Sequence, residues 1–314
     1  MVFSVAIPAT RVTRAKRSNR VKEPRGDRIL LVCIYVLLAL VIVAVMIPLV
    51  YIIASSFSSP LAISAGRVWL WPVDFTTLGY RIVFDYPAVW TGFLNSAIYT
   101  GVGTFLTVAL TALMAFPLSR KGLYGYKVFI WLLLGALLFN GGLIPFYLVV
   151  KDLHMLNTRL ALIVPGALNV FWVMIARAYF IQAVPQELYD AAEVDGCGGL
   201  RFFWSIVLPI SKPILAVVGL LAALLQWNSY FYALIFLDNP NLYPLQLVMR
   251  QILFLGDINN GSIHVNTTAL QTYAALQTSM KYSLIVVGSL PILLIYPLAQ
   301  RYFVKGIMLG SLKE

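Results

Sequence analysis

Six long apolar segments constrain what this chain of 314 residues can fold into. Each is about as long as the ~20 apolar residues that a helix needs to cross the hydrocarbon core of a bilayer. Apolar residues make up 61% of the sequence and charged residues 11%, so a water-soluble fold would expose large apolar patches. Because the apolar runs are continuous and do not alternate with polar residues, they favour helices over a β-barrel. The sequence therefore predicts an all-α membrane protein.

We expect three parts along the chain. A basic cytoplasmic tail takes up residues 1–28, and a transmembrane domain takes up residues 29–301. The six predicted spans within this domain are 29–55, 92–118, 128–150, 160–181, 213–237 and 282–301. A cytoplasmic connection is expected at 182–212 and an extracytoplasmic loop at 238–280, and residues 302–314 form a cytoplasmic C-terminal tail.

The placement of Lys and Arg predicts the orientation in the membrane. Most of the 23 Lys and Arg residues lie in the N-terminal tail, in the connections after the second and fourth spans, and at the C-terminus. Since cytoplasmic loops carry an excess of these residues, both termini and the 182–212 connection are expected in the cytoplasm. Orientation and contact with anionic lipid also explain the formal net charge of +11. Nucleic-acid binding is not predicted, because no groove-reading element accompanies the basic tail.

Few residues in the chain are suited to disulfide formation, metal binding or catalysis. Cys33 lies within a predicted span and Cys197 on the cytoplasmic side, so the two cannot pair. His154 and His264 are too few for a metal cluster, and we expect this chain to bind no metal and no cofactor. An intramembrane enzyme is disfavoured because no nucleophile–base set stands out in the spans. An ion-coupled secondary transporter would need charged residues inside the membrane, and the predicted spans hold almost none.

The 182–212 connection contains the most regular polar element of the sequence. Pro185 is suited to the first turn of a helix, where its missing N–H does no harm. Glu187 and Asp190 then lie near the positive end of the helix dipole, which favours acidic side chains. Gly196 is suited to the left-handed position that ends a helix. The two alanines that precede it in this helix allow another surface to approach closely.

A second short helix is predicted after this glycine. Its apolar face is formed by Phe202, Phe203, Trp204 and Ile206, and Pro209 is expected to stop it. Two roles stay open from these residues alone. The connection is either a rigid element that carries force from a soluble motor into the membrane, or an amphipathic hairpin that lies on lipid.

The connection contains Asp190-Ala191-Ala192, then three residues, then Gly196, then nine residues, and then Ile206-x-Leu208-Pro209. This order of residues resembles the EAA loop of binding-protein-dependent ABC importer permeases. The chain departs from the family pattern at Asp190, where Glu is usual, and at Cys197, where Ala is common. Further segments, Gly141-Gly142-Leu143-Ile144-Pro145 among them, resemble the LplC/YtcP branch of the MalG-like sugar permeases. The resemblance covers nearly everything after residue 29.

This resemblance implies a MetI-like permease fold with six transmembrane helices in the inner membrane of a bacterium. It also implies a second permease subunit, an extracytoplasmic solute-binding protein and a separate ABC ATPase dimer that holds the ATP and Mg²⁺. The chain itself is expected not to be an enzyme, and it has no Gly-x-x-x-x-Gly-Lys-Ser/Thr loop that would bind phosphates. The residues that the resemblance assigns to ATPase coupling are Glu187, Asp190, Ala191, Ala192, Asp195, Gly196, Phe202, Leu208 and Pro209.

The expected cargo is an oligosaccharide or a polysaccharide fragment, with acidic alginate- or pectin-like fragments among the candidates. Another polar solute is the alternative, since the coupling loop is shared across substrates. Four residues in or beside the spans could line the substrate pathway, and these are Asn140, Gln226, Trp227 and Asn228. Hydrogen bonding between helices is the alternative role of each of these side chains.

Overall fold

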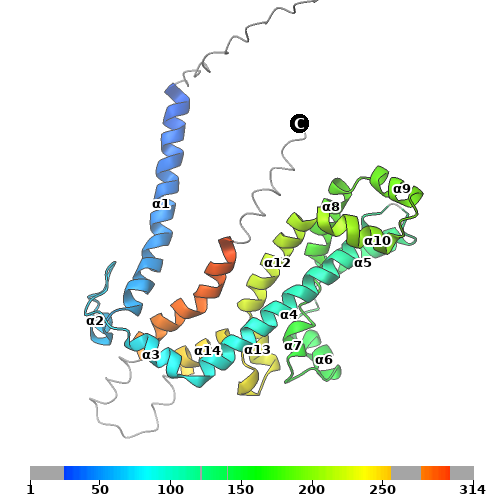
Figure 1. The fold of residues 1–314 in the computed structure, drawn as a ribbon. Helices are drawn as coiled ribbons and strands as arrows, with labels where there is room; N and C mark the ends of the chain where they lie inside the picture. The colour runs from blue at the N-terminus through cyan, green and yellow to red at the C-terminus, as the bar shows by residue number, and fades with distance from the viewer. Residues whose placement is uncertain (1–24, 121, 140, 256–276, 298–314) are drawn as a thin grey trace, which may run out of the picture. The chain divides into compact units, whose positions relative to one another are not determined.

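The computed structural model describes residues 25–120, 122–139, 141–255 and 277–297 (Figure 1). Regular secondary structure in these ranges is helical throughout, with no strand, as the apolar pattern predicts. The predicted N-terminal tail to residue 24, the loop residues 256–276 and the tail from residue 298 lie outside the described ranges. The first elements are α1 (Arg25–Ser56), α2 (Pro60–Ser64), α3 (Leu78–Asp85), α4 (Pro87–Leu118), α5 (Tyr126–Leu138), α6 (Leu143–Asp152), α7 (Leu160–Ile163) and α8 (Val170–Ala183).

The second half of the chain contains shorter helices around one long helix. These elements are α9 (Gln186–Val194), α10 (Gly199–Phe202), the π-helix η1 (Phe203–Val207), α11 (Leu208–Ile210), α12 (Lys212–Trp227), α13 (Phe231–Phe236), η2 (Pro240–Leu242), α14 (Leu245–Arg250) and η3 (Gln251–Leu255). A further helix, Gln277–Pro297, follows residue 276. The chain divides into two units, one ending at Leu49 and the other beginning at Val50. Everything below concerns the second unit.

Three helices are long and apolar enough to cross a membrane by themselves. They are Gly26–Ser56, Pro87–Leu118 and Gln277–Pro297, and they correspond to the first, second and sixth predicted spans. The second begins at Pro87 rather than at residue 92, since proline is well tolerated at the first position of a helix. Counting two bent helix pairs as one span each raises the number to five, so the predicted number of six stays a prediction.

The remaining three predicted spans are interrupted, although the sequence predicts continuous helices there. The 128–150 segment is divided into α5 and α6, which meet at an angle of 117°. Gly142 precedes α6 with a φ of +84°, a conformation that breaks a helix and that glycine adopts readily. The 160–181 segment is divided at Pro165, which follows the short α7. The 213–237 segment is divided after Trp227, where α12 ends before α13 begins.

Helix α4 is the centre of the unit. It packs against α12 along much of its length, and also against α8 and α14. Gly103 permits this close approach, because an added Cβ atom would lie only 2.6 Å from Nε2 of Gln226 on α12. At its N-terminal end, Asn95 donates hydrogen bonds of 2.7 Å and 3.1 Å to the carbonyl oxygens of Asn241 and Tyr243. Helix α4 therefore fixes both α12 and the segment that leads into α14.

Two apolar clusters lie toward opposite ends of α4. One contains Leu118, Phe180 and Phe202, and joins the C-terminal end of α4 to α8 and to the α9–α10 segment. The other contains Tyr99 and Phe236, and joins α4 to α7 and α13. Figure 1 shows α9 and α10 near the C-terminal end of α4, and α6, α7 and α13 on the other side of the unit. The two candidate sites described next follow this division.

Candidate functional site

The first candidate site is the polar hairpin, which we define as residues 186–210, from α9 to α11. Helix α9 begins directly after Pro185, and Glu187 lies in its first turn. The amide nitrogen of Gln186 donates a 2.9 Å hydrogen bond to a carboxylate oxygen of Asp190, one turn later on the same helix. This pairing orients the Asp190 carboxylate along the surface of α9.

A tight glycine turn ends α9. Gly196 has a φ of +71°, which confirms the left-handed conformation expected from the sequence. The N–H of Cys197 donates to the carbonyl of Ala192 over 2.8 Å, and the N–H of Gly196 donates to that of Glu193 over 3.0 Å. These two bonds form a Schellman motif, which satisfies carbonyls that the helix end would leave free. A Cβ atom at position 196 would meet nothing within 4 Å, so the backbone angle alone requires glycine here.

The second half of the hairpin differs from the sequence expectation at Pro209. The helix does not stop at this residue but continues through α11 to Ile210. Directly before it, η1 forms wider π turns, in which the N–H of Leu208 donates to the carbonyl of Phe203. A proline ring clashes with the carbonyl four residues earlier in a regular α-helix. The wide turn moves these carbonyls, and the chain passes the proline without ending the helix.

The predicted coupling residues divide into an inner and an outer set. Ala192 and Phe202 are buried and Leu208 is partly buried, and all three pack in the cluster around the end of α4. The inner set therefore holds the hairpin onto the helical unit. The outer set is exposed and comprises Glu187, Asp190, Ala191, Asp195, Gly196 and Pro209. These residues form the surface that another molecule would meet.

Sequence reasoning missed two apolar side chains on this outer surface and misplaced a third. Val194 is 88% exposed and Leu200 is 76% exposed, on either side of the glycine turn. Trp204, expected on the same apolar face as Phe203, is 64% exposed while Phe203 is 2% exposed. Consecutive residues of a helix lie about 100° apart around its axis, so Trp204 points away from the side on which Phe203 is buried.

A further missed residue is Arg120, which follows the C-terminal end of α4. Its guanidinium carbon lies 5.0 Å, 5.1 Å and 5.2 Å from the ring centroids of Tyr189, Phe116 and Phe202 respectively. Desolvation by this burial lowers the pKa of Arg120, and the nearby charge of Asp190 acts in the opposite direction. In the sequence, Arg120 has no signal beyond its contribution to the positive-inside count.

Arg177 on α8 holds the same end of α4 by hydrogen bonds. Its Nε donates over 2.9 Å to the carbonyl oxygen of Leu118, and its Nη2 donates to the hydroxyl of Tyr126 at the start of α5. Cations near a helix C-terminus are stabilised by the free carbonyls and the dipole. The ends of α4, α5 and α8 are thereby tied together beside the hairpin.

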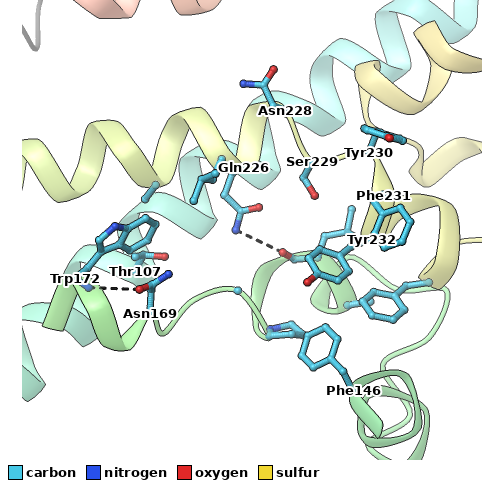
Figure 2. Close-up of a pocket in the computed structure, with 17 residues that line it drawn as sticks. Thr107, Phe146, Asn169, Trp172, Gln226, Asn228, Ser229, Tyr230, Phe231 and Tyr232 are labelled. Carbon is cyan, nitrogen blue, oxygen red and sulfur yellow. Dashed lines mark hydrogen bonds between the residues drawn. The ribbon is translucent and has the colours of Figure 1, made fainter. Parts of the chain in front are cut away.

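The second candidate site is a cavity of about 430 Å³ between α4, α7, α8, α12 and α13 (Figure 2). Its lining combines aromatic rings with amide and hydroxyl groups and contains no charged side chain. The polar and aromatic residues of this lining are Thr107, Phe146, Asn169, Trp172, Gln226, Asn228, Ser229, Tyr230, Phe231, Tyr232 and Phe236. Such a lining is suited to an uncharged, hydroxyl-rich ligand with apolar ring faces.

The predicted pathway residues are only partly brought together by this cavity. Gln226 lines it, and its Nε2 lies 3.5 Å from the carbonyl oxygen of Leu162, a long bond that Figure 2 draws as a dashed line. Asn228 also lines it, but its amide donates over 2.8 Å to Leu224 on its own helix. Trp227 is buried outside the lining and donates over 3.0 Å to the carbonyl of Gly288, which is the interhelical alternative. Asn140 lies outside the described residues.

Several of the cavity residues that sequence reasoning missed lie at or directly after the breaks in the helices. Asn169 follows the break in the fourth predicted span, and its side-chain oxygen accepts from the N–H of Phe171 over 3.0 Å to begin α8. Ser229, Tyr230 and Tyr232 follow the end of α12. A continuous 213–237 helix would distribute these side chains around its circumference, whereas the break directs several of them toward one space.

These features define an integral membrane protein of the transporter class, with membrane-length helices, a cavity lined by uncharged side chains and a polar hairpin at one end of the bundle. The chain belongs to the family of binding-protein-dependent transport system inner membrane components, whose profile matches residues 13–308. Members of this family are transport subunits and not enzymes. The family confirms the assignment that the EAA-like hairpin supports in the sequence.

Similar proteins support the same assignment along most of the chain. The protein LplC of Bacillus subtilis (strain 168) is 36% identical over 92% of this chain and 96% of its own length. The polygalacturonan/rhamnogalacturonan transport system permease protein YtcP of the same organism is 34% identical over 91% and 99%, respectively. A solved chain of a bacterial ABC transporter involved in importing the acidic polysaccharide alginate superposes with a TM-score of 0.80 and 31% identity, covering 89% of this chain and 98% of that chain. This match confirms the expected permease fold.

Proposed function

We propose that this chain is one permease subunit of an ABC importer that moves oligosaccharides or polysaccharide fragments across the cytoplasmic membrane of a bacterium. The observation that carries this proposal is the uncharged cavity, because aromatic faces combined with amides and hydroxyls bind sugar rings and their hydroxyl groups. The transport roles printed for YtcP and for the alginate importer support the same class of cargo.

Acidic saccharides such as alginate or pectin fragments are the cargo that fits the similar proteins best. The cavity itself offers no cation to a carboxylate, since no Lys or Arg lines it. Outside it, Arg67 is already paired over 3.2 Å with Asp74. Within this cavity the subunit therefore contacts ring faces and hydroxyl groups, and the selection for negative charge is made elsewhere in the complex.

The polar hairpin is the docking element for the separate ATPase in this proposal. ATP and Mg²⁺ bind to the ATPase dimer, and closure of that dimer moves the hairpin and drives alternating access to the outside and the inside. A second permease completes the pathway, and an extracytoplasmic binding protein delivers the cargo. The exposed residues at the start of the 238–280 loop, Asp238, Asn239, Pro240 and Asn241, contribute to the outer surface where delivery takes place.

The six-span topology with cytoplasmic termini is part of the same proposal. The cluster around the hairpin gathers the end of α4, the start of α5, the end of α8 and the start of α12. These four helix ends belong on one side of the membrane if the chain crosses it between them. Arg120, Lys127, Arg177 and Lys212 lie at these ends, and the positive-inside rule then assigns this side to the cytoplasm.

Cargo-dependent ATP hydrolysis tests the proposed function. The complete complex in nanodiscs, with its binding protein, is expected to hydrolyse ATP faster in the presence of alginate or oligogalacturonate fragments. Neutral malto-oligosaccharides of the same length serve as the comparison for charge. Stimulation by amino acids or peptides alone would overturn the saccharide proposal, and failure of the ATPase to copurify with the permease would overturn the importer assignment.

Replacing Gln226 by leucine is expected to raise the KM for saccharide uptake by about fivefold, which corresponds to losing one hydrogen bond worth ~1 kcal/mol. The side chain lines the cavity, and its long contact to Leu162 leaves the amide available to a hydroxyl group. Leucine keeps most of the volume that packs over Gly103. Uptake of labelled saccharide into proteoliposomes measures the change.

The matched control is Trp227→Phe, one residue further along α12. Trp227 lies outside the cavity lining, and its indole N–H bonds to Gly288. This variant is expected to lower the free energy of unfolding by ~1 kcal/mol and to leave the KM unchanged. Equal KM values in the Gln226→Leu variant and the unmodified protein would remove Gln226 from the substrate pathway.

A further inference from the structure

Three aromatic rings from two parts of the fold surround the guanidinium group of Arg120. Phe116 belongs to the last turns of α4, whereas Tyr189 lies on α9 and Phe202 on α10. All three ring centroids are within 5.2 Å of the guanidinium carbon. The rings of Tyr189 and Phe202 also meet edge to face, with their centroids 5.2 Å apart. We call this group, Arg120 with its three rings, the arginine cage.

The positive charge in the arginine cage is held by ring faces. Nε and Nη2 of Arg120 are buried and make no hydrogen bond within the described part of the chain. Asp190 is near enough to favour the charge, yet the two side chains make no ion pair. A buried polar group without a partner is costly, and the faces of desolvated aromatic rings are the compensating interaction that this site offers.

Ordinary apolar packing does not require such a group at this place. The surrounding cluster already packs Leu118 and Phe180 against Phe202, and an aliphatic side chain at position 120 would avoid the cost of burial. Arg177 provides the contrast, because its Nε is hydrogen-bonded to α4 and its Nη2 to Tyr126. Arg120 is instead the charged contact between the end of α4 and the hairpin itself.

We propose that Arg120 is a positioning residue that locks the polar hairpin to the C-terminal end of α4, so that both move as one body. The inference rests on the proposed role of the hairpin in docking the ATPase. Movement imposed on α9 then passes through the cage into α4, which packs along α12 and borders the cargo cavity at Thr107. Without the cage, the buried inner set still holds the hairpin to the unit and the hairpin still docks, but a smaller part of its movement reaches the cavity.

Arg120→Met tests this inference, because methionine keeps an unbranched apolar side chain and removes the charge. In the complete complex, the number of alginate tetrasaccharides imported per ATP hydrolysed is expected to fall by about tenfold, within the range that coupling mutations produce. A folding defect would lower import and hydrolysis together and leave this ratio unchanged. Arg120→Lys retains a cation for the rings and is expected to restore part of the ratio.

A second measurement does not depend on the identity of the cargo. Spin labels are placed at Leu113 on α4 and Glu193 on α9, both exposed, after Cys33→Ser and Cys197→Ala. The distance between the labels is expected to be narrowly distributed, with the same value in the nucleotide-free and vanadate-trapped complexes. Arg120→Met is expected to broaden this distance distribution. Loss of a desolvated cation–π contact raises the population of molecules in which the hairpin has separated from α4 by about tenfold.

Two variants of Tyr189, one of the three rings in the arginine cage, provide a conservative and a non-conservative substitution. Tyr189→Phe keeps the ring and is expected to preserve the narrow distribution, while Tyr189→Leu broadens it. Arg201→Met removes the same charge from an exposed position of the hairpin and serves as the control. An unchanged distance distribution and an unchanged import ratio in Arg120→Met would overturn the inference. Failure of the ATPase to bind the unmodified permease would instead overturn the docking proposal, while the label distances would still report on the cage.

Discussion

Replacing Gly196 by valine is expected to abolish cargo-dependent transport while the protein still inserts into the membrane. The residue has a φ of +71°, and a β-branched side chain in this conformation costs roughly 1–2 kcal/mol. The glycine turn would relax, and the two Schellman bonds to Ala192 and Glu193 would be lost. The exposed apolar side chains on either side of the turn would then no longer face one partner together. Uptake into membrane vesicles, normalised to the amount of inserted protein, measures the effect.

The matched control is Gly196→Asn, which separates backbone strain from steric conflict. Nothing lies within 4 Å of the position that a Cβ atom would take, so both side chains find space. Asparagine adopts the left-handed conformation far more readily than valine. We expect Gly196→Asn to retain much of the transport activity, since the short polar side chain of asparagine can form local hydrogen bonds that stabilise the left-handed conformation. Equal activity in the two variants would show that the conformation at Gly196 does not limit transport.

The sequence predicted the first half of the hairpin, α9 with its glycine turn, well because this structure is determined locally. Glu187 in the first turn and Gly196 at the end of the helix lie where they are expected, whereas Pro185 directly precedes α9 instead of lying in its first turn. The all-α class follows equally from composition, because the backbone can satisfy its own hydrogen bonds in lipid only as a helix or closed barrel. The family resemblance added the coupling role, which the residues alone left open.

The breaks in the predicted spans could not be placed from the sequence. Proline and glycine are tolerated inside transmembrane helices when neighbouring helices satisfy the freed backbone groups. Pro117 lies inside α4 without breaking it, whereas Pro165 and Gly142 lie at breaks. The difference depends on what surrounds each residue in the folded unit. The cavity lies beside such breaks, so the part of its lining that comes from them was missed for the same reason.

The arginine cage could not be predicted from the sequence for a related reason. Arg120 is separated along the chain from Tyr189 and Phe202 by α5, α6, α7 and α8. A basic residue after an apolar span is explained well enough by membrane orientation, so its sequence position indicates nothing further. Only the packing of α9 and α10 against the end of α4 reveals that this cation lies between rings.

The exposed apolar pair beside the glycine turn leads to the second large expected effect. Val194→Asp is expected to weaken binding of the ATPase by about a hundredfold, as expected when a central interface side chain is lost and a charge is buried in its place. Val194 is 88% exposed, so the change leaves the free energy of unfolding of this subunit within about 0.5 kcal/mol. Titration of the purified ATPase against the permease in nanodiscs measures the binding.

Val194→Ile and Leu200→Asp complete this experiment and decide between the two roles that the sequence left open. Val194→Ile keeps an apolar surface and is expected to bind the ATPase as the unmodified protein does. Leu200 lies on the other side of the turn and is 76% exposed, so Leu200→Asp is expected to weaken the same binding. If the hairpin instead lies on lipid, Val194→Asp and Leu200→Asp are expected to make the hairpin more accessible to aqueous labelling reagents. The affinity for the ATPase would then stay unchanged. Weakened ATPase binding with unchanged labelling would show that Val194 and Leu200 contact the ATPase and not lipid.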